Sequence, residues 1–327
     1  MTGAPEVKAA ADALRAGQLV AFPTETVYGL GANAYDAAAV AKVFALKGRP
    51  SSNPLIVHVC DEAMAREVVK DWTNEASRLS HAFWPGPLSI VLPKGDRIPD
   101  IVTAGSPNVA VRCPDHPLTL ALIRELACPI VGPSANASGH VSPTTADHVR
   151  AEFGNSVFVL DGGPCKGGIE STVVMLATRP PRVLRPGLTS AEEVGRTLGE
   201  VVRDADFSRD AARATDGSAS ATLDSPGLLE KHYAPRTRAV LVSAAEAPAF
   251  VRRAVGKVVL LTHTPMSPAT PHEVIPLPTD PHAYATAIYA ALRDADARGA
   301  GVIAIVRPDA TGPLWDALRD RLGRATA

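Results

Sequence analysis

Two blocks of alternating apolar runs and amphipathic stretches are separated by a segment that has neither pattern. Residues 203–225 are rich in Asp, Ala, Ser, Thr and Arg and have little apolar periodicity, which is typical of a linker. On both sides, short runs that predict strands alternate with segments that predict helices, and this alternation indicates an α/β fold. We therefore predict an α/β domain over residues 1–205, a linker over 206–237 and a smaller α/β domain over 238–327 with a parallel sheet.

The individual elements follow from the same periodicities. Gly17 and Gly48 are placed to end two helices, and Ser190 with Glu193 forms a capping box that begins another. We predict helices over 7–16, 37–46, 62–69, 75–83, 118–126, 146–153, 190–198, 245–255, 284–298 and 313–322. We predict strands over 19–22, 55–59, 88–92, 109–112, 130–131, 157–160, 172–176, 183–184, 239–242, 258–261 and 302–306.

The composition argues against several classes of protein. The chain has 327 residues, of which 46% are hydrophobic and 20% are charged, so it can build two packed cores. Its net charge of -1 gives no support to bulk binding of nucleic acid. The four cysteines have no CxxC spacing, so we expect neither a zinc site nor a disulfide framework. Because residues 1–16 lack an apolar signal core and no apolar run could cross a membrane, we expect a cytoplasmic protein.

The segment Lys47-Gly48-Arg49-Pro50 is the first candidate for a binding site. A lysine supplies a compact charge and an arginine a planar fork, so the pair can hold several anionic oxygens. Lys47 alone could simply end a helix, where a cation interacts well with the helix dipole. Asn53 and His58 follow closely, however, and His58 ends an apolar strand, where ligands often lie in α/β folds. Together these residues favour a functional loop, although a lone histidine is more often structural.

Polar and basic residues also follow other predicted strands. Thr26 lies in the turn after 19–22, and Ser134 and Asn136 follow 130–131. Arg112 and Arg185 end two further strands. Each alone could be an ordinary turn, cap or surface charge, but together they predict one anion-binding cleft. Since the sequence has no HExxH, G-x-S-x-G or kinase signature, we expect the site to work by positioning and charge neutralisation.

Two glycine-rich segments look like nucleotide-binding loops but lack the required context. Residues 29–34 fit a loose dinucleotide pattern, yet they neither directly follow a predicted strand nor begin a helix. In residues 162–168, Lys166 is followed by glycine in place of Ser or Thr, so the Walker arrangement fails. We expect a flexible turn there, whose backbone amides could still bind an anion. A nicotinamide-dependent function is kept only as a fallback.

Taken together, the motifs resemble the YrdC/Sua5 family. The similar segments are 22–30, 47–50, 54–58, 84–87, 133–136, 170–173 and 184–187, and the likeness spans roughly residues 5–205. Residues 225–227 and 231–235 resemble the linker of the longer Sua5 type, with Leu228 where the family usually has methionine. The resemblance implies an N-terminal YrdC-like twisted mixed sheet flanked by helices, and a smaller C-terminal Rossmann-like α/β Sua5 domain.

The resemblance also implies an activity. Members of this type are threonylcarbamoyl-AMP synthases, nucleotidyltransferases that use L-threonine, bicarbonate or CO2, and ATP, and that release pyrophosphate. Their product feeds the t6A modification of tRNA, so the implied partner is the downstream tRNA threonylcarbamoyl-transfer machinery, with direct contact to tRNA left open. Mg²⁺ would be carried by the ATP phosphates without a metal site on the protein, and no redox cofactor is implied.

The resemblance also assigns roles to individual residues of this sequence, at the positions that match the family's motifs. The resemblance implies a central catalytic tetrad of Lys47, Arg49, Ser134 and Asn136. It implies ATP contacts from Arg49, Asn53, Asn108, Asn136, Thr144, Arg185 and Tyr233, with Tyr233 folding the linker over the site as a lid. It implies threonine contacts from Thr26, His58, Arg112, Ser134 and Ser171.

Two other functions remain as alternatives at this point. An RNA-binding or ribosome-assembly module could use the same basic cleft, but it would need stacking aromatics or a broad basic face. Aromatic residues are only 5% of the chain and its charge is balanced, which counts against that function. A carbamoyl-transfer domain of the hydrogenase-maturation type would share this fold. It would be expected to carry zinc-finger and acylphosphatase-like segments, which this sequence lacks.

Overall fold

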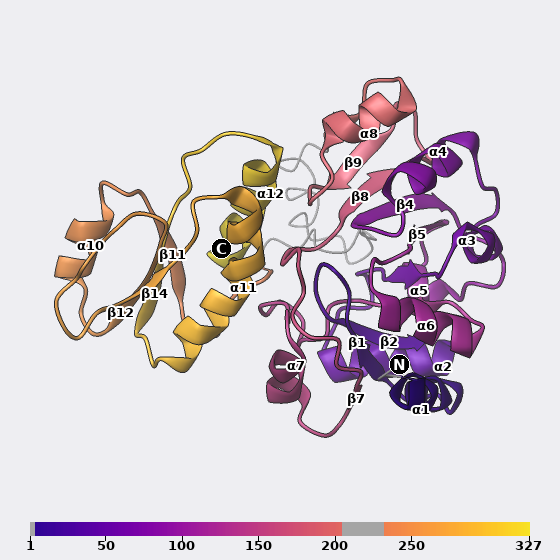
Figure 1. Ribbon diagram of the computed structural model, residues 1–327, viewed down its shortest axis with the longest axis horizontal. Helices are drawn as coiled ribbons and strands as arrows, with labels where there is room; N and C mark the ends of the chain where they lie inside the picture. The colour runs from indigo at the N-terminus through magenta and orange to yellow at the C-terminus, as the bar shows by residue number, and fades with distance from the viewer. Residues whose placement is uncertain (1–3, 205–231) are drawn as a thin grey trace.

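The computed structural model describes residues 4–204 and 232–327, which form two α/β domains (Figure 1). The helices of the N-terminal domain are α1 (Ala4–Arg15), α2 (Ala37–Lys47), α3 (Glu62–Val68), α4 (Asn74–Phe83), α5 (Asp100–Thr103), α6 (Pro117–Leu126), α7 (Ala146–Phe153) and α8 (Ala191–Leu198). Its strands are β1 (Val20–Phe22), β2 (Gly29–Asn33), β3 (Ile56–His58), β4 (Leu88–Pro93), β5 (Asn108–Arg112), β6 (Ile130–Val131), β7 (Phe158–Val159), β8 (Thr172–Met175), β9 (Arg182–Arg185) and β10 (Arg203–Asp204).

The N-terminal strands form one mixed sheet of ten strands in the order β10-β9-β8-β4-β5-β3-β6-β2-β1-β7. Strands β3 and β5 are parallel, whereas β6 runs antiparallel to β3. This combination confirms the mixed sheet that the family resemblance implied. It also matters for the site, because strands of both directions bring strand ends and strand beginnings to the same edge.

The two faces of this sheet carry different side chains. Val57, Ile90 and Val111 point into the main apolar core of the domain. Their neighbours Ile56 and Ala110 belong to a separate small cluster on the other face, as expected from the two-residue period of a strand. His58 and Arg112 follow that alternation, so they lie on the face with the small cluster. The second face is therefore the one on which a polar site can be built.

The C-terminal domain is a four-stranded sheet in the order β11-β14-β12-β13, and all its pairings are parallel. Its elements are β11 (Ala239–Val242), α10 (Ala247–Arg253), β12 (Val258–Thr262), β13 (Glu273–Pro276), α11 (Pro281–Ala297), β14 (Val302–Val306) and α12 (Pro313–Ala325). One apolar cluster joins the sheet to α11 and α12, and another joins it to α10. The predicted parallel α/β unit is confirmed.

Most predicted elements are present within a few residues of their predicted bounds. Gly48 ends α2 in the left-handed conformation, and the capping box of Ser190 and Glu193 begins α8. The sequence analysis missed β2, α5, β10 and β13. Strand β2 is formed by residues 29–33 of the glycine-rich segment that matched a loose dinucleotide pattern. This segment is therefore not a phosphate-binding loop, as the sequence analysis concluded. Among the described residues, no helix is long and apolar enough to span a bilayer.

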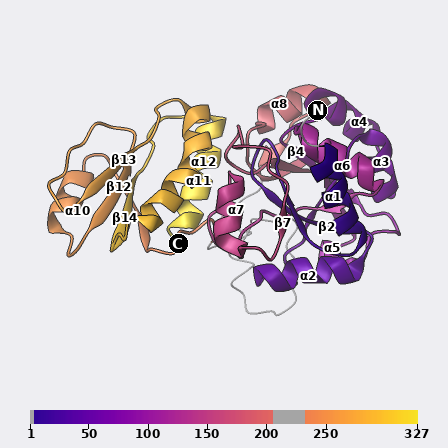
Figure 2. The same ribbon diagram turned by 60° about the horizontal axis from the view of Figure 1, so that its bottom comes forward.

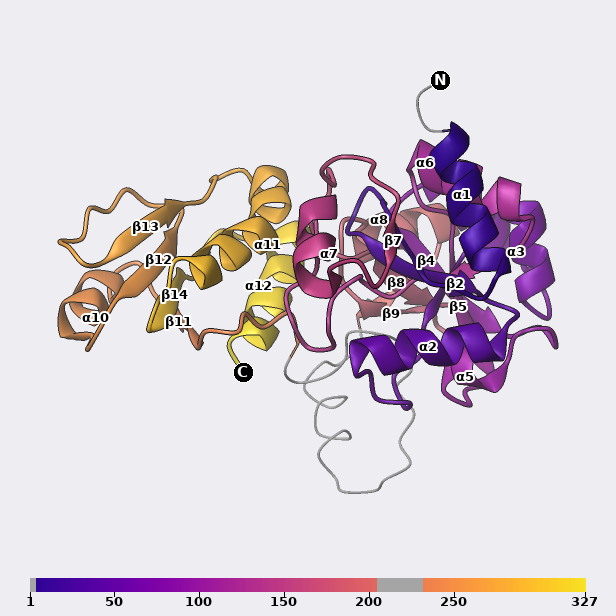
Figure 3. The ribbon, with the colours of Figure 1, turned by 90° about the horizontal axis from the view of Figure 1, so that it is seen from below.

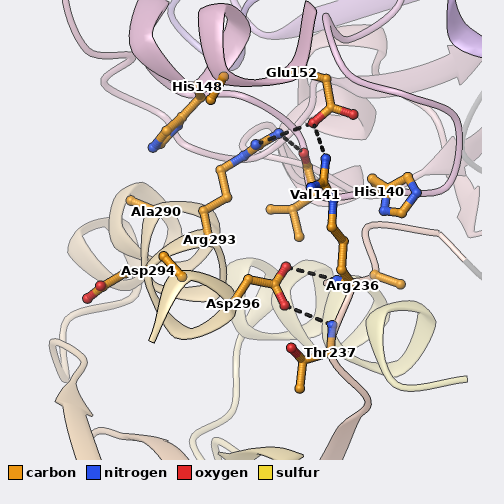
Figure 4. Close-up of a pocket in the computed structure, with 13 residues that line it drawn as sticks. His140, Val141, His148, Glu152, Arg236, Thr237, Ala290, Arg293, Asp294 and Asp296 are labelled. Carbon is orange, nitrogen blue, oxygen red and sulfur yellow. Dashed lines mark hydrogen bonds and ion pairs between the residues drawn. The ribbon is translucent and has the colours of Figure 1, made fainter. Parts of the chain in front are cut away.

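The two domains lie side by side, with α11 and α12 of the C-terminal domain facing α7 (Figures 2 and 3). Residues 205–231 lie outside the described residues, so of the predicted linker 206–237 only 232–237 are described. A cavity of about 490 Å³ lies between α7 and α11 (Figure 4). In it, Glu152 is 3.8 Å from Arg293 and 3.7 Å from Arg236, and it accepts a hydrogen bond from the backbone N–H of Ala137.

Candidate active site

A small cavity brings together residues from distant parts of the N-terminal domain and two residues, His232 and Tyr233, of the predicted linker. Six residues that the sequence analysis selected line it, namely Thr26, Arg49, Arg112, Ser134, Arg185 and Tyr233. The cavity has a volume of only about 50 Å³, whereas pockets for small molecules usually measure roughly 300–1,000 Å³. The predicted convergence of cations is confirmed for the arginines. Lys47 is buried but does not line the cavity.

Arg49 is held by the loop that precedes β3. Its Nε donates to the carbonyl of Asn53 at 3.0 Å, and one terminal nitrogen donates to Asn53 Oδ1 at 2.6 Å and to the carbonyl of Pro54 at 2.7 Å. Burial lowers the pKa of Arg49 to about 9, which leaves the guanidinium charged at neutral pH. Asn53 keeps a buried Nδ2 with no hydrogen-bond partner among the described residues. This loop therefore presents a fixed cation and a free donor.

Lys47 supports the loop that follows β6. At the end of α2, its Nζ donates to the backbone carbonyls of Ser134 and Asn136. Burial, followed by the nearby charge of Arg49, lowers the pKa of Lys47 well below its usual value, and Glu152 partly opposes this shift. Because its donors point into the loop, Lys47 fixes the backbone of residues 134–136.

The threonine in the turn after β1 is fixed by an arginine from β5. The Arg112 guanidinium donates to Thr26 Oγ1 at 2.9 Å and to the carbonyl of Gly86 at 3.2 Å. It also forms an ion pair with Glu25 at 2.7 Å. Thr26 and Arg112 are both almost fully buried. Their side chains thus form one rigid wall of the cavity.

Ser171 and Arg185 form a second polar unit. They lie at the start of β8 and at the end of β9, which are antiparallel, so the two positions share one edge of the sheet. Arg185 donates to the Ser171 carbonyl at 3.0 Å and to its Oγ at 3.1 Å. Burial lowers the pKa of Arg185. Ser171 is completely buried and does not line the cavity, so Arg185 is the member that faces it.

His58 lies directly beneath the loop after β6. Its ring packs edge-on against Phe22 with the centroids 5.4 Å apart, and its Nδ1 is buried without a hydrogen-bond partner among the described residues. Burial, aided by the charge of Arg112, lowers the pKa of His58 well below its usual value, so the ring is neutral. A Cβ at Gly132 would lie 2.6 Å from this ring, so only glycine lets the loop pass over it. His58 itself does not line the cavity.

The remaining predicted residues take different places. Asn136 donates to the carbonyls of Ala137 and His140, and its buried Oδ1 has no partner among the described residues. Thr144 is buried and its Oγ1 lies 3.3 Å from His148 Nδ1, at the beginning of α7. Asn108 begins β5 and is therefore at the opposite end of this strand from Arg112. The structure does not bring Asn108 or Thr144 to the cavity wall.

Tyr233 closes the cavity from the linker side. It is 1% exposed and adopts a left-handed backbone conformation with φ 60°, which is uncommon for a residue other than glycine. Its ring stacks on Tyr289 of α11 at 5.8 Å, and the backbone N–H of the next residue, Ala234, donates to the carbonyl of Gly139. The Tyr233 hydroxyl is buried without a partner among the described residues.

The structure adds two wall residues to which the sequence analysis gave no role. Glu170 is buried beside Ser171 and accepts hydrogen bonds from Ser142 at 2.6 Å and Tyr289 at 2.9 Å. Burial acts to raise the pKa of Glu170, but the charges of Arg321 and Arg185 outweigh it, and the pKa falls below its usual value. His232 packs edge-on against Tyr233 at 4.1 Å. The only sequence signal for either was its position next to an assigned residue.

Comparison with known proteins gives the family. The family model described as telomere recombination, which covers Sua5, YciO and YrdC proteins, matches residues 12–187. The model for the C-terminal domain of threonylcarbamoyl-AMP synthase matches residues 189–327. The chain therefore belongs to the Sua5/YrdC family and has both domains of the Sua5 type.

Individual relatives within the family indicate which enzyme the chain is. A threonylcarbamoyl-AMP synthase of Pyrococcus abyssi is 44% identical over 239 residues, which are 72% of this chain and 68% of the relative. One of Bacillus subtilis is 45% identical over 236 residues, 72% of this chain and 66% of the relative. The crystal structure of P. abyssi Sua5 complexed with L-threonine matches with a TM-score of 0.88 at 37% identity, covering 98% of this chain and 94% of that one. The chain is a threonylcarbamoyl-AMP synthase.

Proposed function

We propose that the chain condenses L-threonine, bicarbonate or CO2, and MgATP into L-threonylcarbamoyladenylate and pyrophosphate. The observation that carries this proposal is the gathering of three buried arginines, Arg49, Arg112 and Arg185, around one cavity. A site with this much positive charge suits two anionic reactants that repel each other. The enzyme would act in the cytoplasm, and its product would pass to the tRNA threonylcarbamoyl-transfer machinery for t6A synthesis. Contact with the tRNA itself is open.

The threonine side of the site is assigned to the Thr26–Arg112 wall. Arg112 is nearly buried and would bind the substrate carboxylate, while Thr26, Ser134 and Ser171 offer hydroxyl groups for the amino and hydroxyl groups of threonine. His58 lies below this wall with an unpaired ring nitrogen and is assigned as an orienting residue. The known complex of P. abyssi Sua5 with L-threonine supports threonine as the amino-acid substrate.

The nucleotide side is assigned to the Arg49 loop and to Arg185. Arg49 and Arg185 would bind phosphate oxygens, and the unpaired Nδ2 of Asn53 and Oδ1 of Asn136 are free for further hydrogen bonds. Buried polar atoms are almost always paired in folded proteins, so these two atoms support a ligand at this place. None of the four residues Asn53, Asn136, Thr144 and Asn108 lines the cavity, and Thr144 and Asn108 also lack an unpaired buried polar atom, so their assignment to ATP rests on the family resemblance alone.

The reaction then proceeds in two bond-forming steps. The unprotonated threonine amine attacks the carbon of CO2 or bicarbonate. With CO2 the amine releases one proton to water; with bicarbonate the carbon loses hydroxide, which leaves as water with the amine proton. An oxygen of the resulting N-carboxylate attacks the α-phosphorus of ATP, and the bond from this phosphorus to the β-phosphate oxygen breaks. Holding the reactants in place can remove about 7–11 kcal/mol of the barrier in well-oriented cases.

The protein contributes charge and position to these steps. Arg49 and Arg185 would offset the repulsion between the N-carboxylate and the triphosphate. Lys47 would act mainly through the loop carbonyls of Ser134 and Asn136, which it binds. Among the described residues there is no group of three His, Cys, Asp or Glu side chains that could hold a metal ion. Mg²⁺ is therefore assigned to the substrate, where phosphates and water are its preferred ligands.

Tyr233 is assigned as a lid. With Tyr233 in place, about 50 Å³ of the cavity remains, which is far too little for ATP. The ring and its neighbour His232 must therefore move when the nucleotide enters. Closing again over the bound reactants would keep water from the labile N-carboxylate.

One incubation tests the proposed reaction. The protein is mixed with ATP, Mg²⁺, L-threonine and ¹³C-bicarbonate, and pyrophosphate and the adenylate are measured by mass spectrometry. We expect pyrophosphate release that depends on threonine, and an adenylate that contains the labelled carbon. Pyrophosphate release at the same rate without threonine, or with serine in its place, would contradict the assigned substrate.

A further inference from the structure

A buried arginine of the C-terminal domain reaches across the domain boundary to residues of the cavity wall. Arg321 lies on α12 near the end of the chain, yet its side chain is only 1% exposed. Its Nε donates to Glu170 Oε2 at 3.0 Å, and one terminal nitrogen donates to the carbonyl of Pro186 at 2.8 Å. The other terminal nitrogen donates to Asp320 at 2.6 Å. Two of its three nitrogens are therefore committed to the N-terminal domain.

The two acceptors lie next to residues of the active site. Glu170 immediately precedes Ser171, and Pro186 immediately follows Arg185. Ser171 and Arg185 are themselves hydrogen-bonded to each other. Arg321 thus binds both segments directly beside the Ser171–Arg185 unit, at the residue before Ser171 and at the residue after Arg185. A shift of either segment would move the guanidinium of Arg185 in the cavity.

The same side chain also contacts the lid. The guanidinium carbon of Arg321 is 5.1 Å from the centre of the Tyr233 ring, within the range of a cation–π interaction. Tyr289 completes the group, since it stacks on Tyr233 and donates to Glu170. One arginine therefore touches a segment of the proposed threonine side, a segment of the proposed nucleotide side and the lid.

From these contacts, we infer that Arg321 is a positioning residue that the C-terminal domain contributes to the active site. It acts through Glu170 and Pro186 on Ser171 and Arg185, and through its guanidinium face on Tyr233. The inference rests on the proposed roles of Ser171 and Arg185. A guanidinium suits this task because its planar nitrogens donate in different directions at fixed angles, which a lysine ammonium cannot reproduce.

Simple docking of the two domains is the competing explanation. A buried ion pair is weak evidence for stability, because desolvation of both charges offsets their attraction. Other contacts already tie the domains together, among them Thr286 with the carbonyl of Lys166 and Arg293 with the carbonyl of Val141. Neither contact involves Glu170, Ser171, Arg185 or Pro186, so docking does not require Arg321 to bind beside the Ser171–Arg185 unit.

Substitutions on α12 distinguish the two explanations. Arg321→Gln removes the charge, and Arg321→Lys keeps the charge near Glu170 but cannot hold the Pro186 carbonyl as well. The control is Arg319→Gln on the same helix, because the hydrogen bonds of Arg319 among the described residues go to Asp316, Pro308 and Ala310, all within the C-terminal domain. For each variant of the full chain we would measure Tm, the Kd for L-threonine by calorimetry, and KM and kcat of pyrophosphate release.

We expect Arg321→Gln to raise the KM for ATP and the Kd for threonine at least tenfold. Arg321→Lys is expected to keep Tm within a few degrees of the unmodified protein and still raise the KM for ATP several-fold. Arg319→Gln is expected to keep the unmodified values. A fall in Tm with unchanged Kd, KM and kcat in both Arg321 variants would overturn the inference. If Arg321→Gln does not fold, the Kd, KM and kcat of Arg321→Lys alone test the inference. An unmodified protein that releases no pyrophosphate with threonine would instead refute the proposed function.

Discussion

At the scale of single residues, the site is built from buried cations whose hydrogen bonds fix their direction. Arg49 makes three hydrogen bonds to the Asn53–Pro54 segment, and Arg112 bonds to Thr26 and Gly86. Each guanidinium is thereby held before a substrate arrives, so little ordering is needed when a phosphate or carboxylate binds. The shape of the arginine should therefore matter as much as its charge.

Arg49→Lys tests this point, because it keeps a positive charge and loses the fork. Hydrogen bonds to charged groups contribute about 1.5–3 kcal/mol each. We expect kcat/KM for ATP to fall roughly 10- to 150-fold. This range corresponds to the loss of one such hydrogen bond, because each 1.36 kcal/mol changes a rate about tenfold. The matched control is Arg97→Lys, because Arg97 is exposed and packs on the Tyr35 ring, away from the cavity. Equal activity of the two lysine variants would show that charge alone suffices at position 49.

At the scale of elements, the segment from His232 to Ala234 is the proposed lid of the site. It is held by the stack of Tyr233 on Tyr289 and by the hydrogen bond from Ala234 to Gly139. The left-handed backbone of Tyr233 costs about 1 kcal/mol or more for a residue that is not glycine. The contacts of the ring with Tyr289 and His232 offset this cost.

Tyr233→Ala should weaken closure. We expect a higher KM for ATP, by about tenfold, because the ring loses its contacts with Tyr289 and Arg321. We also expect hydrolysis products of the carbamate to appear beside the adenylate, measured by mass spectrometry. Tyr233→Phe keeps the ring and removes a hydroxyl that has no partner in the described residues, so its effect should be much smaller. An equally large effect of phenylalanine would assign the function to the hydroxyl group.

At the scale of the whole molecule, docking of the two domains holds the cavity wall from behind. The domains approach each other closely at Gly168, where a Cβ would clash with the carbonyl oxygen of Ala285 on α11. Gly168 lies two residues before Glu170. The carboxylate of Glu170 accepts hydrogen bonds from Tyr289 and Arg321 of the other domain. The backbone contact and the polar contacts therefore depend on the same short segment.

Gly168→Ala should disturb docking, and the chain offers a close control. Gly168 and Gly163 both have a positive φ, of 76° and 79°, so alanine is strained at either position. A Cβ at Gly163 meets nothing within 4 Å. We expect Gly163→Ala to cost about 1 kcal/mol of stability, and Gly168→Ala to cost clearly more and to lower activity. Thermal unfolding and pyrophosphate release would measure both. Identical results for the two variants would mean that the approach of α11 is unimportant.

The sequence by itself determined the local elements and the chemistry of the site. Periodicity and caps placed most helices and strands, because α2 and α8 end or begin at residues whose conformation is locally favoured. The ordered motifs identified the family and the arginines that line the cavity. Strands β2, β10 and β13 were missed. Strand β2 is rich in glycine, β10 has two charged residues, and the two apolar residues of β13 lie between Glu273 and Pro276, which are residue types disfavoured in strands.

Only the tertiary structure decided which selected residues share the cavity and which others join them. Asn108 and Arg112 belong to one strand, yet the length of β5 separates them and only Arg112 faces the cavity. Arg321 had no local signal, because its partners Glu170 and Pro186 are more than a hundred residues away. Strand direction and domain docking are set by long-range packing, and the sequence pattern near a residue carries no information about a partner so distant.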